Sequence, residues 1–178
     1  MDVRADARFG GAPLKIGWTQ RFYAGDGPSK FDVEGVFDSA TGDVFGVPTR
    51  QFLRGPVGFK AAAVGDLGAI RSLSLEADFT KAALTVEPIN WRKAADMRAA
   101  GRMEVSFAAD VIAIKSASLE GEDIAVSGKG ALTPAGALLS AEFDRIRLGS
   151  AADVSLRAAR EASGALKAEI AGAYLDAG

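Results

Sequence analysis

The sequence contains no histidine and no cysteine. The chain therefore has no serine–histidine–aspartate or cysteine–histidine machinery, no disulfide and no zinc site built on those side chains. Iron–sulfur ligation and thiol redox chemistry are excluded for the same reason. The lack of cysteine fits an oxidising compartment without establishing one. These absences leave carboxylates as the only plausible catalytic acids and bases.

An excess of charge of either sign is also lacking. The 21 basic and 23 acidic residues give a formal net charge of −2, and both signs are spread evenly over the two halves of the chain. Nucleic-acid binding needs a basic field that holds the phosphate backbone. We therefore expect no nucleic-acid partner, and no motif in the sequence indicates a cofactor.

Long hydrophobic runs are missing, although 48% of the residues are hydrophobic. The longest apolar stretches, such as 137–139, are far shorter than the roughly 20 residues that span a bilayer. Residues 1–8 alternate between charged and apolar types and lack the apolar region of a signal peptide. We expect residues 1–178 to be a single β-rich segment excised from a longer, repetitive protein, with the targeting signal outside it.

Apolar and polar residues alternate through nearly the whole chain. A period of two residues predicts strands with one buried face. Turn signals rich in Gly, Asp and Pro separate the alternating runs. The predicted strands lie in the ranges 3–9, 14–22, 31–38, 57–63, 73–80, 103–111, 117–119, 124–126, 139–148, 154–157 and 166–170.

The alternation changes phase once, near Asp144. Phe143 continues one apolar series, whereas Ile146 and Leu148 belong to the opposite phase. One extra residue has this effect, so we predict a β-bulge there. Two further segments are rich in the helix formers Ala, Arg and Glu. Alternation favours a strand in 151–161, whereas a loop and a short helix remain equally plausible for 94–100.

A sheet with one apolar face has to hide that face, and two arrangements do so. The sheet either packs on a second sheet as a closed β-sandwich or curls into a trough. Many inner positions are Ala, which favours a trough over a tightly filled core. We predict an all-β antiparallel meander curled into a one-sided apolar groove, with at most one short helix and a closed β-sandwich as the alternative. The groove-lining candidates are Leu73, Leu75, Phe79, Val105, Phe107, Phe143, Val154 and Leu156.

Two short patterns have a chemical and a structural interpretation. Glu120, Glu122 and Asp123 form the densest carboxylate cluster, as a hard-metal site or a glycosidase pair would. The glycine among them is more typical of an exposed hairpin turn. Residues 127–130 read SGKG, but a phosphate-binding loop also has a Gly five residues before Gly128 and a Ser or Thr after Lys129, and both are missing here. We therefore predict no metal site and no catalytic residue.

Three further residues stand out. Trp18 and Trp91 are candidate ligand platforms, although tryptophans more often fill a core or cover a sheet end. Asp78 lies on the polar face of a predicted strand, where it is either an exposed residue or a turn-capping carboxylate.

Residues 73–84 read LSLEADFTKAAL and residues 88–93 read PINWRK. They resemble the leucine–alanine–aspartate–leucine–threonine … alanine … proline … tryptophan … lysine signature of the AsmA-like proteins, in particular the YhdP-type branch that is related to TamB. Phe79 stands where the family usually has Leu, and no proline follows Lys93. The resemblance covers roughly residues 10–176 and assigns Asp78, Trp91 and Lys93 to the family motif.

The resemblance implies a role in the cell envelope of Gram-negative bacteria. The family consists of long periplasmic proteins that are anchored in the inner membrane and implicated in moving phospholipid towards the outer membrane. It implies that this chain is a non-catalytic segment of an intermembrane phospholipid transport bridge, whose groove shields acyl chains. The alternative is a TamB-like scaffold for outer-membrane biogenesis. The expected partners are phospholipid acyl chains and, through the rest of the protein, both membranes. We also expect the segment to self-associate through its sheet edges.

Overall fold

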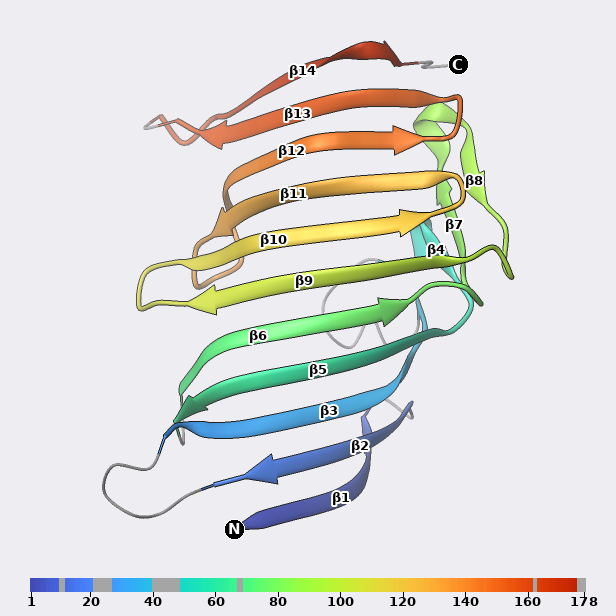
Figure 1. The fold of residues 1–178 in the computed structure, drawn as a ribbon. Coiled ribbons are helices and arrows are strands. Elements are labelled where there is room, and N and C mark those ends of the chain that lie inside the picture. The colour runs from blue at the N-terminus through green and yellow to red at the C-terminus, as the bar shows by residue number, and fades with distance from the viewer. Residues whose placement is uncertain (10–11, 21–26, 40–48, 67–68, 162, 176–178) are drawn as a thin grey trace.

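The computed structural model describes residues 1–9, 12–20, 27–39, 49–66, 69–161 and 163–175. These residues contain one antiparallel sheet of 11 strands and a second sheet of 3 strands (Figure 1). The strands of the main sheet are β1 (Asp2–Phe9), β2 (Ala12–Thr19), β3 (Ser29–Phe37), β5 (Val57–Asp66), β6 (Ala69–Asp78), β9 (Ala99–Phe107), β10 (Ile112–Gly121), β11 (Ile124–Leu132), β12 (Leu138–Leu148), β13 (Ala152–Arg160) and β14 (Leu166–Leu175). The strands of the small sheet are β4 (Leu53–Arg54), β7 (Ala83–Val86) and β8 (Trp91–Lys93).

The main sheet is an open meander. Its strands follow one another in chain order, except that β4, β7 and β8 leave to form the small sheet. The edge strands β1 and β14 lie at opposite ends of the sheet, which therefore does not close into a barrel (Figure 1). The prediction of an all-β antiparallel meander is confirmed. The closed β-sandwich is wrong, because the small sheet is far too short to cover the main sheet.

The predicted bulge is present in β12. Ser127 of β11 pairs with Arg145, whereas the next residue, Gly128, pairs with Phe143. Asp144 is thus the extra residue, and the pairing of β12 with β13 shifts at the same place. The bulge returns Ile146 to the same face as Phe143, which is why the apolar phase changes along the sequence.

The predicted strand in 151–161 is confirmed as β13. Residues 94–98 form turns before β9 begins, and the two three-residue 3-10 helices lie elsewhere, at Thr49–Gln51 and Glu87–Ile89. The run predicted at 103–111 is too long, because the Ala108 N–H donates to the Val111 carbonyl, 2.9 Å away, and turns the chain after Phe107. Residues 21 and 22, predicted as part of a strand, lie outside the described residues.

The small sheet covers only one end of the main sheet. It lies against the ends of β5, β6 and β9–β13, at the right of Figure 1. The buried core forms there and consists of Leu53, Val57, Ala77, Ala82, Leu84, Trp91, Ala99, Ile124, Leu148 and Ala152. No helix in the described part of the chain has the length and apolar character needed to cross a membrane.

Candidate functional site

Three rows of apolar residues run across all the strands of the main sheet. Residues that pair directly across antiparallel strands project to the same face. The first row is Val3, Trp18, Phe31, Ala63, Leu73, Val105, Ile114, Gly130, Ala141, Ala158 and Ala168. The central row is Ala5, Ile16, Val33, Ala61, Leu75, Met103, Ala117, Gly128, Phe143, Leu156 and Ile170. The third row is Ala7, Leu14, Gly35, Phe59, Ala77, Gly101, Leu119, Val126, Ile146, Val154 and Gly172.

Every member of the three rows is apolar or glycine, so together they form one continuous apolar surface, which we call the groove floor. Strands lie about 4.8 Å apart, which makes the floor of this sheet of 11 strands about 48 Å long. Three rows that alternate with outward-facing residues span about 13 Å along the strands. Half the hydrocarbon thickness of a bilayer is about 15 Å. The floor is therefore several times as long as one acyl chain.

Most of the groove floor has no second layer over it within the described structure. Its larger side chains are half-buried by their neighbours in the sheet rather than by a facing element. At the two edges exposure is higher: Val3 is 39% exposed and Ile170 is 57% exposed. The accessible surface of the chain is 11274 Å², against about 8,200 Å² for a compact monomer of this mass. An open apolar face accounts for a difference of this kind.

The eight groove-lining candidates all lie on the apolar face. Six of them are members of the three rows: Leu73, Leu75, Val105, Phe143, Val154 and Leu156. Phe107 pairs with Ile112 beside the first row. Phe79 follows β6, and its ring lies over Gly101 of β9, where a Cβ atom would come within 3.0 Å of Cε2. Ala109, which continues the apolar alternation of the run predicted at 103–111, lies in an exposed turn instead.

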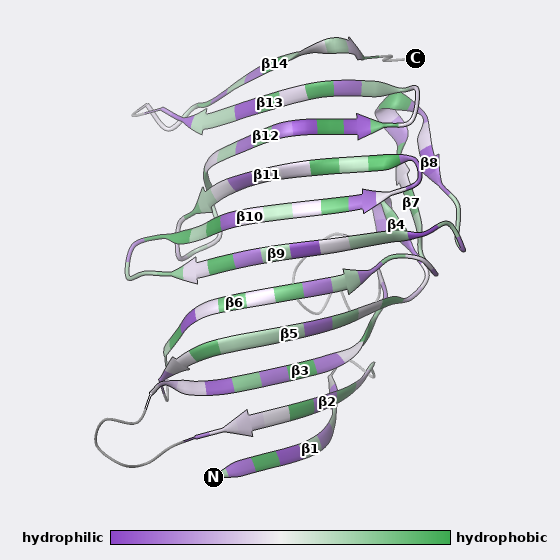
Figure 2. Cartoon of the chain, in the orientation of Figure 1, coloured by the Kyte–Doolittle hydropathy of each residue, from purple (hydrophilic) through white to green (hydrophobic). Residues whose placement is uncertain are grey.

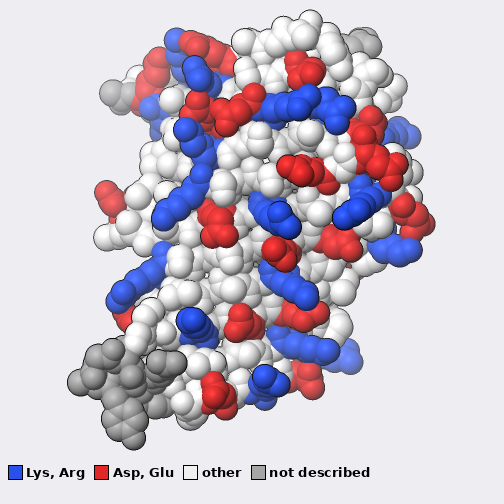
Figure 3. All heavy atoms as spheres, in the orientation of Figure 1, with Lys and Arg blue, Asp and Glu red and all other residues white. Residues whose placement is uncertain are grey.

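The opposite face of the main sheet is charged. One cross-strand series on this face alternates strictly in sign through β1, β2, β3, β5, β6 and β9. It consists of Asp6, Lys15, Glu34, Lys60, Glu76 and Arg102. Figure 3 shows acidic and basic side chains interspersed over this face, and Figure 2 shows the alternation of hydropathy along the strands that produces it. Because opposite charges stand side by side, the outer face is hydrated without creating a field of one sign.

The small sheet forms a wall along one side of the groove floor. A cavity of about 740 Å³ lies where the wall meets the floor, within the roughly 300–1,000 Å³ of typical ligand pockets. Leu119 and Val126 of the third row contribute to it from the floor, and Leu84, Val86 and Pro88 contribute from the wall. The cavity is therefore a mostly apolar recess that opens beside the groove.

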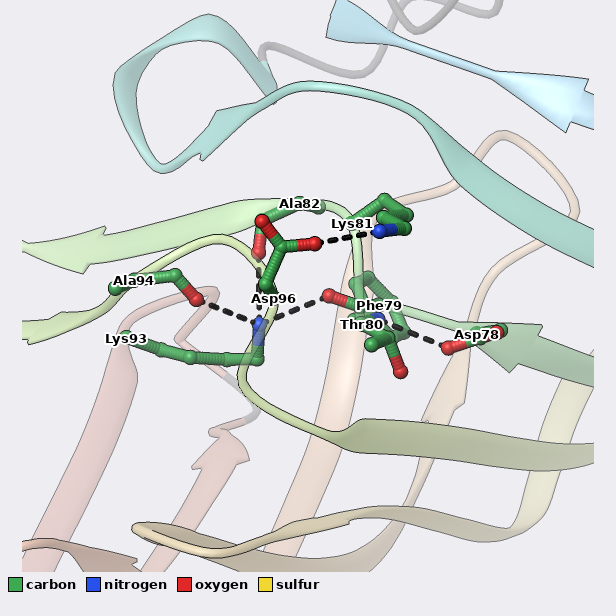
Figure 4. A network of polar contacts seen from close by, with 8 residues as sticks. All are labelled: Asp78, Phe79, Thr80, Lys81, Ala82, Lys93, Ala94 and Asp96. Carbon is green, nitrogen blue, oxygen red and sulfur yellow. Dashed lines mark hydrogen bonds and ion pairs between the residues drawn. The ribbon is translucent and has the colours of Figure 1, made fainter.

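A buried lysine holds the wall in place (Figure 4). Lys93 of β8 is 2% exposed, and its Nζ donates to the carbonyl oxygens of Phe79, Ala82 and Ala94 at 2.9, 2.8 and 3.0 Å. The ammonium group thus ties the chain after β6 to the end of β8. Burial lowers the pKa of Lys93, and Asp78 and Asp96 oppose that shift through their negative charge.

The turns around Lys93 are fixed by two further polar contacts. The Thr80 N–H donates to Oδ1 of Asp78 at 2.9 Å, and hydrogen bonding by Thr80 lowers the pKa of the Asp78 carboxyl. Lys81 and Asp96 form an exposed ion pair at 2.6 Å, which raises the pKa of Lys81 and lowers that of Asp96. Both interpretations of Asp78 hold, because its carboxylate is exposed and caps the turn after β6.

The two tryptophans occupy different places. Trp91 is 5% exposed in the core between the two sheets, and its Nε1–H donates to Oδ2 of Asp123 at 3.3 Å. Trp18 lies in the first row, stacked on Phe31 with ring centroids 6.1 Å apart. Of the three motif residues, Trp91 and Lys93 thus lie in the wall strand β8, and Asp78 ends β6 with its side chain exposed on the outer face. Trp18 is part of the groove floor.

The candidate chemical patterns lie in ordinary β-structure. Glu120 lies in β10, and Glu122 and Asp123 form the turn between β10 and β11. No group of metal-ligating side chains is found within the described ranges. Residues 127–130 are part of β11 rather than a loop, and Lys129 pairs with Glu142 on the outer face at 3.0 Å.

The comparisons with known proteins leave the resemblance to AsmA-like proteins a prediction. No protein-family model matches the sequence, and no curated protein or solved structure gives a significant match. The wall and its buried lysine were not predicted from the residue pattern. In the sequence, only the short segment 88–93 hinted at the wall. Its Pro88 precedes Trp91 and Lys93, whose side chains are both buried in the structure.

Proposed function

We propose that this chain is a segment of an intermembrane phospholipid transport bridge in the periplasm of a Gram-negative bacterium. Its apolar groove shields acyl chains from water while the head groups remain outside. The rest of the protein connects the segment to the inner and outer membranes. The observation that carries this proposal is the continuous apolar surface of the three rows, which crosses the sheet from one edge strand to the other without a polar side chain.

The energetics of such a surface suit a lipid carrier. Shielding a methylene group from water is worth about 0.8 kcal/mol, so eight methylenes contribute about 6 kcal/mol without any specific contact. A floor with no polar side chain offers nothing to select one head group. The charged outer face keeps the open sheet soluble. We therefore expect binding that depends on acyl-chain length and little on head-group chemistry.

The recess beside the wall supports the same proposal. It is apolar, it adjoins the floor, and its size suits part of an acyl chain. Trp91 and Lys93, two of the three residues that suggested the family, belong to this wall.

The proposal is tested by extracting the purified chain with organic solvent and measuring phospholipid by mass spectrometry, with a β-sandwich of similar size as the reference. We expect at least one phospholipid per chain. Leu75→Glu places a charge in the central row and should abolish retention. Ser72→Glu places the same charge on the outer face of the same strand, opposite Val64 and Ser106, and should retain lipid. Circular dichroism confirms that both variants are folded.

A scaffold for outer-membrane biogenesis is the second candidate. The two edge strands favour it, because β1 and β14 each pair on one side only in the described sheet and offer free edges to other strands. A folded chain that retains no lipid above the reference protein would reject the transport proposal and favour the scaffold.

A further inference from the structure

Strand β1 is an edge of the described sheet, and its outward backbone groups belong to charged residues. Met1 and Gln20 exchange two hydrogen bonds, of 2.6 Å and 2.9 Å, and are therefore a hydrogen-bonded pair of the β1–β2 ladder. Because such pairs alternate along an antiparallel ladder, the N–H and C=O groups of Val3, Ala5 and Ala7 point towards β2. Those of the four charged residues point away from the sheet: Asp2, Arg4, Asp6 and Arg8.

The charges along this edge alternate in sign, so that a second, antiparallel copy of β1 can place opposite charges across from them. Asp2, Arg4, Asp6 and Arg8 are all exposed and project to the outer face. If a second copy of β1 runs antiparallel with Ala5 opposite Ala5, Asp2 faces Arg8 and Arg4 faces Asp6. A shift of two residues in either direction places like charges opposite each other. A shift of one residue turns the apolar residues to the charged face.

We propose that two copies of this chain pair antiparallel through β1, about a twofold axis beside Ala5, and form one continuous sheet. Every outward N–H and C=O group from Asp2 to Arg8 then gains a partner in the other copy. The apolar residues continue the groove floor, because Val3 lies opposite Ala7 and Ala5 lies opposite its own equivalent. The pairing is independent of lipid binding, but it would double the length of the floor.

The other edge is less suited to set a register. On the charged face β14 carries Lys167 and Glu169, which already pair with each other along the strand at 2.8 Å. In β1 the charged residues do not pair along the strand, and only Asp6 faces a charge on β2, namely Lys15. Each opposite-charge pair across strands adds to the affinity, and each like-charge pair subtracts from it.

The register is tested by cysteine cross-linking, since the chain has no cysteine of its own. Ala5 faces its equivalent as a non-hydrogen-bonded pair, with Cα atoms about 4.5 Å apart, which permits a disulfide. We expect Ala5→Cys to form disulfide-linked dimers under mild oxidation. Val3→Cys alone should not, because its equivalent lies about 13 Å away. A mixture of Val3→Cys and Ala7→Cys chains should form cross-linked dimers, because Val3 of one copy lies opposite Ala7 of the other. Failure of Ala5→Cys to cross-link, or efficient cross-linking of Val3→Cys alone, would overturn the proposal.

The role of the charges is tested by sedimentation equilibrium of the full chain at low salt. Asp2→Arg and Arg8→Asp each place like charges opposite each other twice in a homodimer, so each should weaken dimerisation about tenfold or more. Mixing the two variants restores opposite charges at both places and should restore dimers, an effect that a folding defect would not produce. Glu169→Lys on the other edge is the control and should leave dimerisation unchanged. A monomeric wild-type chain, dimers unaffected by both β1 variants, or dimers lost only in Glu169→Lys would each refute the pairing.

Discussion

The ring of Phe143 in β12 lies over Gly128 of β11. A Cβ atom built at Gly128 would come 2.7 Å from Cδ1 of Phe143 and 2.5 Å from the carbonyl oxygen of Glu142. Phe79 lies over Gly101 and Phe59 lies over Gly35 in similar contacts, at 3.0 and 3.2 Å. At three of the five glycines in the rows, an aromatic ring thus fills the space that a side chain would occupy.

These contacts predict that Gly128→Ala lowers the free energy of unfolding by about 1–3 kcal/mol, since the methyl group meets backbone as well as the Phe143 ring. Urea unfolding measures the change. Gly58→Ala on the outer face is the matched control, because its Cβ would be 4.0 Å from the nearest atom. Equal stability of the two variants would contradict the close packing.

Lys93→Met should destabilise the protein by about 2–4 kcal/mol, because three carbonyl groups lose a charged donor. The loss is again measured by urea unfolding. Arg92→Met removes an exposed cation from the neighbouring position and should change stability by less than about 0.5 kcal/mol. A similar effect of both substitutions would show that the buried ammonium group does not hold the wall.

The same lysine predicts a pH dependence with a definite sign. Its folded-state pKa is lowered below 10.5, so between the two pKa values the unfolded chain binds more protons than the folded chain. The stability of the wild type relative to Lys93→Met should therefore rise with pH in the range below 10.5. Comparing unfolding at pH 7 and at pH 10 tests this, because other titrating groups cancel in the difference. A difference that stays constant or shrinks would mean that burial does not lower this pKa.

Lys60→Glu should reduce stability by about 1–2 kcal/mol at low salt. Lys60 pairs with Glu34 on one side and Glu76 on the other, so the substitution replaces two attractive pairs with two repulsive ones. In 1 M salt most of the loss should disappear. Lys115→Glu is the control for a change of charge, because the pairing of β10 shifts at Lys115 and leaves it without a directly opposite residue. A loss that salt does not reduce would point to packing rather than charge.

Deleting Asp144 should be far more damaging than replacing it. The deletion removes the bulge and turns either Phe143 or Ile146 to the charged face, which exposes a large part of the apolar set of β12. We expect loss of the cooperative unfolding transition. Asp144→Ala keeps the extra residue and should alter stability by less than about 0.5 kcal/mol. A stable deletion variant would show that β12 re-registers freely.

The bulge also illustrates which parts of the fold the sequence predicts. A one-residue insertion leaves a visible phase change, so its position near Asp144 was predicted and is confirmed. Continued alternation is a weaker guide to where a strand ends: Val111 keeps the phase of Phe107, yet the chain has already turned. The pattern assigns a residue to a face, but only the pairing register places it beside a given partner.

The wall could not be predicted for a different reason. Its strands contain two to four residues, too few to establish a period. A lysine is also rarely fully buried, so the inward position of Lys93 contradicts the usual expectation for a charge. Only the contacts with the carbonyl groups of Phe79, Ala82 and Ala94 explain it. The first two belong to the turn after β6 and the third follows β8, so they are distant in the sequence pattern.

The chain-order connectivity of the main sheet has a consequence for its size. Since each strand pairs chiefly with its neighbours in the sequence, an added hairpin would meet only the strand that it extends and would disturb no existing contact. Each such hairpin would lengthen the sheet by about 10 Å. The number of strands can therefore vary in this architecture. Duplication of a gene segment that encodes a hairpin would lengthen the sheet and leave the contacts of the buried core unchanged.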